Sequence, residues 1–147
     1  MLPASYWITG LITAAVVIVC VLTHYEGLRL LSDRLPAPRR HHRRRIVFLI
    51  LSLLIMHVVE IWLFGGAYFV LLSFGNFGAL EGATDANLFD CVYFSASVYT
   101  TVGFGDIVPI GPIRTMSGTE GITGLVMITW SASFALMEML KNWDKGD

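Results

Sequence analysis

The chain has 147 residues, of which 55% are hydrophobic and 14% charged, and its formal net charge is −1. Soluble domains are usually about 45–50% apolar and about 25% charged, so this composition is typical of a membrane protein and excludes intrinsic disorder. The near-zero net charge argues against a nucleic-acid-binding protein. Two cysteines, Cys20 and Cys91, are too few for a disulfide framework.

The first apolar run covers residues 6–23 and carries no formal charge. Its length is close to the roughly 20 residues that cross a hydrocarbon core of about 30 Å. A secretory signal peptide has basic residues before its apolar core, whereas here they follow it. We therefore predict a retained transmembrane helix over residues 1–25, with its N-terminus outside the cell.

A basic loop is predicted over residues 26–45. It holds most of the ten lysines and arginines of the chain: Arg29, Arg34, Arg39, Arg40, Arg43, Arg44 and Arg45. The positive-inside rule places this loop in the cytoplasm, and residues 39–45 can also bind anionic lipid, although we favour the purely topological role. The arginines are not a voltage sensor, because such sensors carry arginine at every third position within an apolar helix.

The second apolar run predicts an outer helix over residues 46–74. It is followed by an apolar stretch at residues 88–99, which at about 1.5 Å per residue reaches only halfway through a bilayer. We expect a re-entrant helix that is capped by Asn87, carries Asp90 in its first turn and enters from the outer side. Irregular backbone at membrane depth needs protein or water around it, which favours a pore.

The motif TTVGFGD follows this short helix at residues 100–106. It resembles the filter signature of the potassium channel family, Thr-Val-Gly-Tyr/Phe-Gly-Asp, and a glycine-rich surface turn does not explain so complete a match. Residues 46–140 are similar to small prokaryotic channels with an outer helix, a pore helix, a filter and an inner helix, here predicted over residues 114–140. The additional first helix departs from the two-span pattern.

The resemblance implies an all-α membrane protein with three transmembrane helices, a re-entrant pore helix and a selectivity filter, assembled as a homotetramer. Rings of backbone carbonyls then replace the hydration shell of K⁺, which is the permeant ion, and no cofactor is expected. The ion-binding residues are Thr101, Val102, Gly103, Phe104 and Gly105. The two glycines accept the positive φ that an alternating backbone requires.

Four residues are expected to support the filter: Thr100, Asp106, Tyr93 and Ser97. The resemblance implies that Asp106 accepts a hydrogen bond from an aromatic residue of the pore helix, here Tyr93. Phe104 stands where tyrosine is commoner, and Ser97 stands where some relatives have an acid. Both departures affect the expected stiffness of the filter.

The inner helix carries Gly124, ten residues after Arg114, where the family has its hinge glycine. Close packing between helices explains the same residue, and we leave both interpretations open. Thr129 and Ser133 follow as candidates for lining the inner cavity. A cytoplasmic tail is predicted over residues 141–147.

Three ionisable residues fall within the predicted spans: His57, Glu60 and Glu120. Such residues are costly in a membrane and are therefore candidates for function. They can form a cluster behind the pore helix that couples proton binding to gating, or they can be neutral or hydrogen-bonded structural groups. We favour the structural interpretation.

These patterns predict a potassium-selective channel with passive flux in the plasma or inner membrane, with its C-terminus in the cytoplasm. The alternatives are a non-selective cation channel and a non-conducting membrane sensor or subunit that retains the pore fold. An enzyme is not expected, because the sequence shows no nucleophile–base pair, metal-ligand cluster or phosphate-binding loop.

Overall fold

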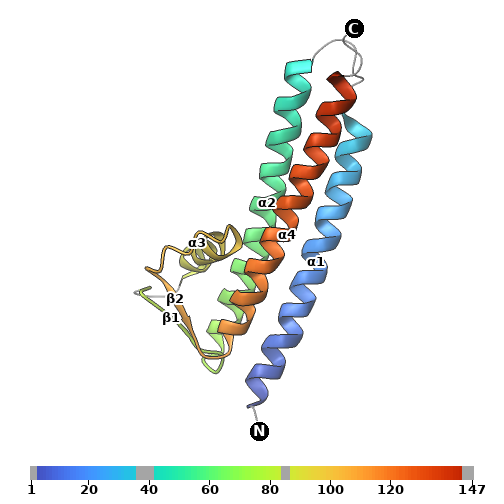
Figure 1. The fold of residues 1–147 in the computed structure, drawn as a ribbon. Helices are drawn as coiled ribbons and strands as arrows, with labels where there is room; N and C mark the ends of the chain where they lie inside the picture. The colour runs from blue at the N-terminus through green and yellow to red at the C-terminus, as the bar shows by residue number, and fades with distance from the viewer. Residues whose placement is uncertain (1–2, 36–41, 84–86, 144–147) are drawn as a thin grey trace.

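The computed structural model describes residues 3–35, 42–83 and 87–143. Three long helices, α1 (Ala4–Arg34), α2 (His42–Ser73) and α4 (Ile113–Trp143), run side by side (Figure 1), and each is long and apolar enough to cross a membrane. The short helix α3 (Leu88–Tyr99) projects to one side of them. The chain is a multi-pass membrane protein that is almost entirely helical.

The described helices extend further than predicted around the basic segment. α1 continues to Arg34 instead of ending at residue 25, and α2 begins at His42, so a loop over residues 26–45 is wrong. The apolar repeat of α1 continues through the buried Leu28 and Leu31, and charged residues on a helix that projects past the bilayer remain in water. The lipid prediction for Arg39 and Arg40 lies outside the described residues.

Two short strands depart from the all-α expectation. β1 (Ala79–Glu81) pairs antiparallel with β2 (Val108–Ile110), with Leu80 opposite Pro109. Strands of three residues are too short to show the alternation by which a strand is recognised in a sequence. They join the segment after α2 to the segment after the TTVGFGD motif.

The helix α3 covers the predicted range and packs against both α2 and α4. The Asn87 side chain caps it as expected, accepting hydrogen bonds from the Phe89 and Asp90 amides at 2.8 and 3.1 Å. The core behind α3 combines residues of all four helices: Cys20, Phe64, Tyr68, Cys91, Phe94, Tyr99, Ile113 and Met116. A helix this short is marginal alone, so this packing is what positions it.

One face of α1 packs against α2 and α4. Its buried threonines, Thr9 and Thr13, donate their hydroxyls to carbonyls of α1 itself, those of Ser5 and Thr9, at 2.8 and 2.7 Å. The opposite face exposes Trp7, Leu11 and other large apolar side chains. An apolar outer face of this kind suits contact with lipid.

Candidate functional site: the TTVGFGD loop and the groups behind it

The TTVGFGD loop has an alternating backbone. Thr101, Gly103 and Gly105 have φ angles of 58°, 57° and 78°, whereas Val102 and Phe104 between them do not adopt positive φ. Thr101 is the only residue other than glycine with positive φ in the described part of the chain. That conformation is unusual for a β-branched residue and was not predicted, and such strained positions concentrate at functional sites.

Ser97 of α3 holds the loop from behind. Its carbonyl accepts a hydrogen bond from the Gly103 amide at 3.1 Å, and its hydroxyl accepts one from the Phe104 amide at 3.2 Å. The carbonyl of a trans peptide points opposite to its N–H. The carbonyls of Val102 and Gly103 therefore point away from α3, toward the open side of the loop.

A hydrogen bond closes the outer end of the loop. The Tyr93 hydroxyl donates to Asp106 Oδ2 at 2.7 Å, the contact that the family resemblance implied. This bond holds the pKa of Asp106 below its usual range. Phe104 lacks a phenol, but its ring lies parallel to that of Tyr93 at a centroid distance of 6.3 Å. Thr100 caps the C-terminus of α3, and its hydroxyl donates to the Ala96 carbonyl.

A buried cluster surrounds Glu60 on α2. Glu60 Oε1 lies 2.8 Å from His24 Nδ1, and Glu60 Oε2 lies 3.2 Å from His57 Nδ1 and accepts a hydrogen bond from the Tyr99 hydroxyl. We call Glu60, His24, His57 and Tyr99 the Glu60 cluster. The ligand atoms of the two histidines and the glutamate lie within 4.8 Å of one another, close enough for one metal ion, and here they satisfy each other by hydrogen bonds.

Two members of this cluster were missed from the sequence. His24 follows directly after the first apolar run, and an ionisable residue so close to a span was the signal that could have identified it. Tyr99 is the last residue of α3 and gave no signal of its own. His24 also contacts α4, where its ring lies 5.1 Å from that of Trp130 and its Nε2 lies 3.4 Å from Ser131 Oγ.

Glu120 belongs to a second buried cluster. It accepts hydrogen bonds from the Tyr68 hydroxyl at 2.6 Å and the Ser95 hydroxyl at 2.5 Å. We call Glu120, Tyr68 and Ser95 the Glu120 cluster. The structure thus divides the three ionisable candidates between two sites, because α3 presents Tyr99 to one acid and Ser95, one turn earlier, to the other.

The inner helix α4 approaches the end of α3 at Gly124. A Cβ atom at this position would lie 2.0 Å from the Tyr99 carbonyl oxygen, so close packing requires glycine here. A hinge at Gly124 stays a prediction. Thr129 and Ser133 are exposed on α4, and their hydroxyls donate to carbonyls of their own helix.

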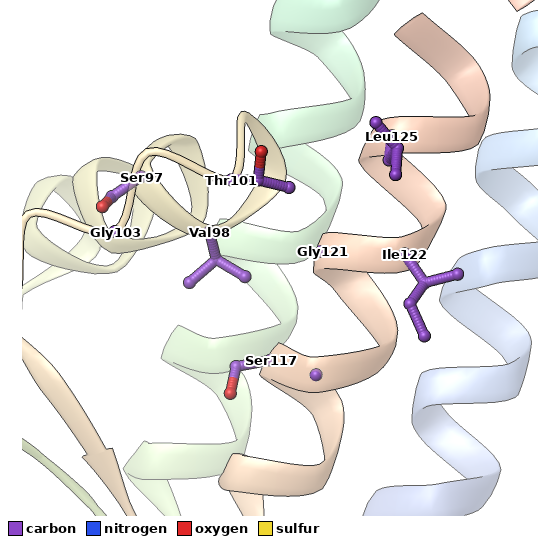
Figure 2. Close-up of a pocket in the computed structure, with 9 residues that line it drawn as sticks. Ser97, Val98, Thr101, Gly103, Ser117, Gly121, Ile122 and Leu125 are labelled. Atoms are coloured by element: carbon purple, nitrogen blue, oxygen red, sulfur yellow. The ribbon is translucent and has the colours of Figure 1, made fainter. Parts of the chain in front are cut away.

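An open groove of about 440 Å³ separates the TTVGFGD loop from α4. Figure 2 shows Val98 and Thr101 on the loop side and Ser117, Gly121 and Leu125 on α4. The loop itself is exposed throughout residues 100–106, including the apolar side chains of Val102 (57%) and Phe104 (68%). Exposed apolar side chains beside an apolar groove are typical of an interaction surface.

A protein-family model described as "Ion channel" matches residues 46–141, which contain nearly all of α2, the pore loop and most of α4. No curated protein and no solved structure gives a significant match. The family consists of ion channels and not of enzymes, and the matched segment covers more than half of the chain. The chain therefore belongs to the ion channel family, and it carries the membrane-capable helix α1 in addition to the matched pore domain.

Proposed function

We propose that this channel conducts K⁺ selectively through a filter formed by residues 101–105. The observation that carries the proposal is the alternating loop tied to Ser97, which turns the Val102 and Gly103 carbonyls away from α3. Rings of such carbonyls replace the hydration shell of K⁺, and the number and field strength of the oxygens discriminate against Na⁺. The Thr101 hydroxyl adds an oxygen at the inner end.

The proposed channel is a homotetramer. Each chain contributes one loop, and a filter of this type needs four loops around a central axis. The exposed Val102 and Phe104 and the groove along α4 support this assembly, because a neighbouring copy would cover them. Four copies also place the C-terminal, negative ends of the α3 helices around one cavity, which favours a cation there.

The proposed orientation has the N-terminus outside and the C-terminus in the cytoplasm. In Figure 1 the N-terminus lies at the end of the bundle that carries β1 and β2, and the C-terminus lies at the opposite end. The arginines of α1 and α2, including Arg34 and Arg43, lie toward the C-terminal end, as the positive-inside rule requires. Glu81 and Asp106 then lie at the outer mouth, where negative charge attracts cations.

The test is ion flux into proteoliposomes that contain the purified full-length chain. We expect K⁺ and Rb⁺ to enter and Na⁺ to be excluded. Gly103→Ala should abolish the flux, because its φ of 57° costs an L-residue about 1–2 kcal/mol in every subunit. Gly10→Ala is the matched control, since a Cβ there meets open space.

Each alternative has its own signature in the same experiment. Equal entry of Na⁺ and K⁺ would identify a non-selective cation channel. A folded tetramer without flux under any ionic gradient would favour a non-conducting sensor or subunit. Either result would overturn the proposed selective conduction of K⁺.

A further inference from the structure

We propose that α1 contributes to the function of the pore, because its His24 is a positioning residue for the inner end of the filter. In this proposal His24 fixes Glu60, Glu60 fixes the Tyr99 hydroxyl, and Tyr99 sets the position from which the filter begins. The role in conduction rests on the proposed function, whereas the positioning itself can be measured without ion flux.

The first step is the division of the Glu60 carboxylate between its partners. Oε1 receives its hydrogen bond from His24, the only partner that this oxygen has among the described residues. Oε2 serves His57 and Tyr99. Glu60 and His24 are both completely buried, so no solvent replaces a lost partner. Removing His24 therefore leaves half of the carboxylate unsatisfied and free to turn.

The second step leads from Glu60 to the filter. Tyr99 is completely buried and is the last residue of α3. Its hydroxyl is held by Glu60 and lies 3.0 Å from His57 Nδ1, and its carbonyl faces α4 at Gly124. Two residues later, Thr101 adopts its left-handed conformation and begins the filter. A change at the Tyr99 side chain thus acts on the backbone that sets the first ion site.

The third step is a comparison within α1. Thr9 and Thr13 are also buried polar residues, but their hydroxyls are satisfied by carbonyls of α1 and contribute packing only. His24 instead bonds to Glu60 on α2 and lies 3.4 Å from Ser131 on α4. A buried histidine is costly in a membrane, and apolar packing alone would anchor α1 at lower cost. The position of His24 therefore indicates a connection to the pore domain.

The test exploits the two nitrogens of the imidazole ring. An asparagine side chain places its amide group near the position of Nδ1, which faces Glu60, whereas a glutamine side chain reaches the position of Nε2, which faces Ser131. We expect His24→Asn to retain Rb⁺ flux and His24→Gln and His24→Leu to reduce it several-fold. Thr13→Val is the control for packing of α1 and should conduct like the wild type.

A second measurement follows the same variants without using conduction. Amide hydrogen exchange, read by mass spectrometry on peptides covering residues 96–104 of the detergent-purified full-length channel, should rise in His24→Gln and His24→Leu. It should stay at the wild-type level in His24→Asn and Thr13→Val. If His24→Leu does not assemble, the Asn and Gln variants provide the comparison.

The outcomes separate this inference from the proposed function. A wild-type chain that excludes K⁺ would overturn the proposed function, and the exchange measurement would still test the positioning role. Asn and Gln variants with equal flux and equal exchange would overturn the positioning role, because only ring volume would then matter. Wild-type exchange and flux in an assembled His24→Leu channel would overturn it as well.

Discussion

Two completely buried glutamates lie behind the pore helix, and they are satisfied in different ways. Glu120 on α4 accepts hydrogen bonds from two hydroxyls, those of Tyr68 and Ser95. Glu60 on α2 is surrounded by two imidazoles and one hydroxyl. Both clusters reach α3, one turn apart, but only the Glu60 cluster includes a residue from α1.

The difference shows which part of α3 is held by the pore domain alone and which part also needs α1. The Glu120 cluster lies entirely within the segment that matches the ion channel family, and its Ser95 hydroxyl also lies 2.9 Å from the Ile61 carbonyl. The middle of α3 therefore has an alternative acceptor within the pore domain. The end of α3 depends on Glu60, which in turn depends on a helix outside that domain.

Removal of each acid should give the largest contrast. Glu60→Leu removes the acceptor shared by three helices: it leaves His24 Nδ1 without its acceptor, at about 1–3 kcal/mol for a buried group, and it leaves His57 and Tyr99 with only each other, at 3.0 Å. Glu120→Leu leaves only the Tyr68 hydroxyl without an acceptor, because the Ser95 hydroxyl can still donate to the Ile61 carbonyl. We expect the midpoint of thermal unfolding in detergent to fall further for Glu60→Leu. Equal losses would show that the two clusters do not differ in this respect.

Removal of one hydroxyl from each cluster should separate stability from conduction. Tyr99→Phe and Tyr68→Phe each lose one buried hydrogen bond, and each should cost about 0.5–1.5 kcal/mol of unfolding free energy. Only Tyr99 adjoins the proposed filter, so Tyr99→Phe should reduce Rb⁺ flux into proteoliposomes and Tyr68→Phe should leave it near the wild-type rate. Equal reduction in both variants would contradict the special role of the Glu60 cluster.

The smallest effect is expected at the exposed acid of the outer mouth, where solvent screens the interaction. Tyr93 lowers the pKa of Asp106 by donating to its ionised form. This contribution to stability is present above the ordinary pKa of about 4 and is lost as pH falls through the lowered value. Tyr93→Phe should therefore be less thermally stable than the wild type at pH 7, and the difference between the two should shrink as pH falls below about 4.

An unfolding series from pH 7 to pH 3 checks this expectation. Tyr25→Phe is the matched control, because Tyr25 is an exposed tyrosine on α1, far along the chain from the TTVGFGD loop. A difference in thermal stability between Tyr93→Phe and the wild type that is zero at pH 7, or that stays constant down to pH 3, would show that the hydrogen bond to ionised Asp106 does not contribute to stability.

Features carried by contiguous residues could be read from the sequence. The apolar runs predicted three spans, and the length of residues 88–99 predicted the half-span that became α3. The Asn87 cap and the bond between Tyr93 and Asp106 were also expected, since each lies within one short segment or one family motif. These features depend on length, local hydrogen bonding and backbone conformation, which a linear pattern records.

Features that join distant segments were decided by the tertiary structure. Whether His24 meets Glu60 depends on the rotation of α1 about its axis and on its shift along α2, and an apolar run of nearly uniform hydrophobicity specifies neither. The pairing of β1 with β2 and the close approach of Gly124 to the Tyr99 carbonyl also depend on how segments far apart in the chain pack together. The sequence therefore predicted a pore-loop channel, whereas only the packing of the helices showed that the additional helix reaches the end of α3 beside the TTVGFGD loop.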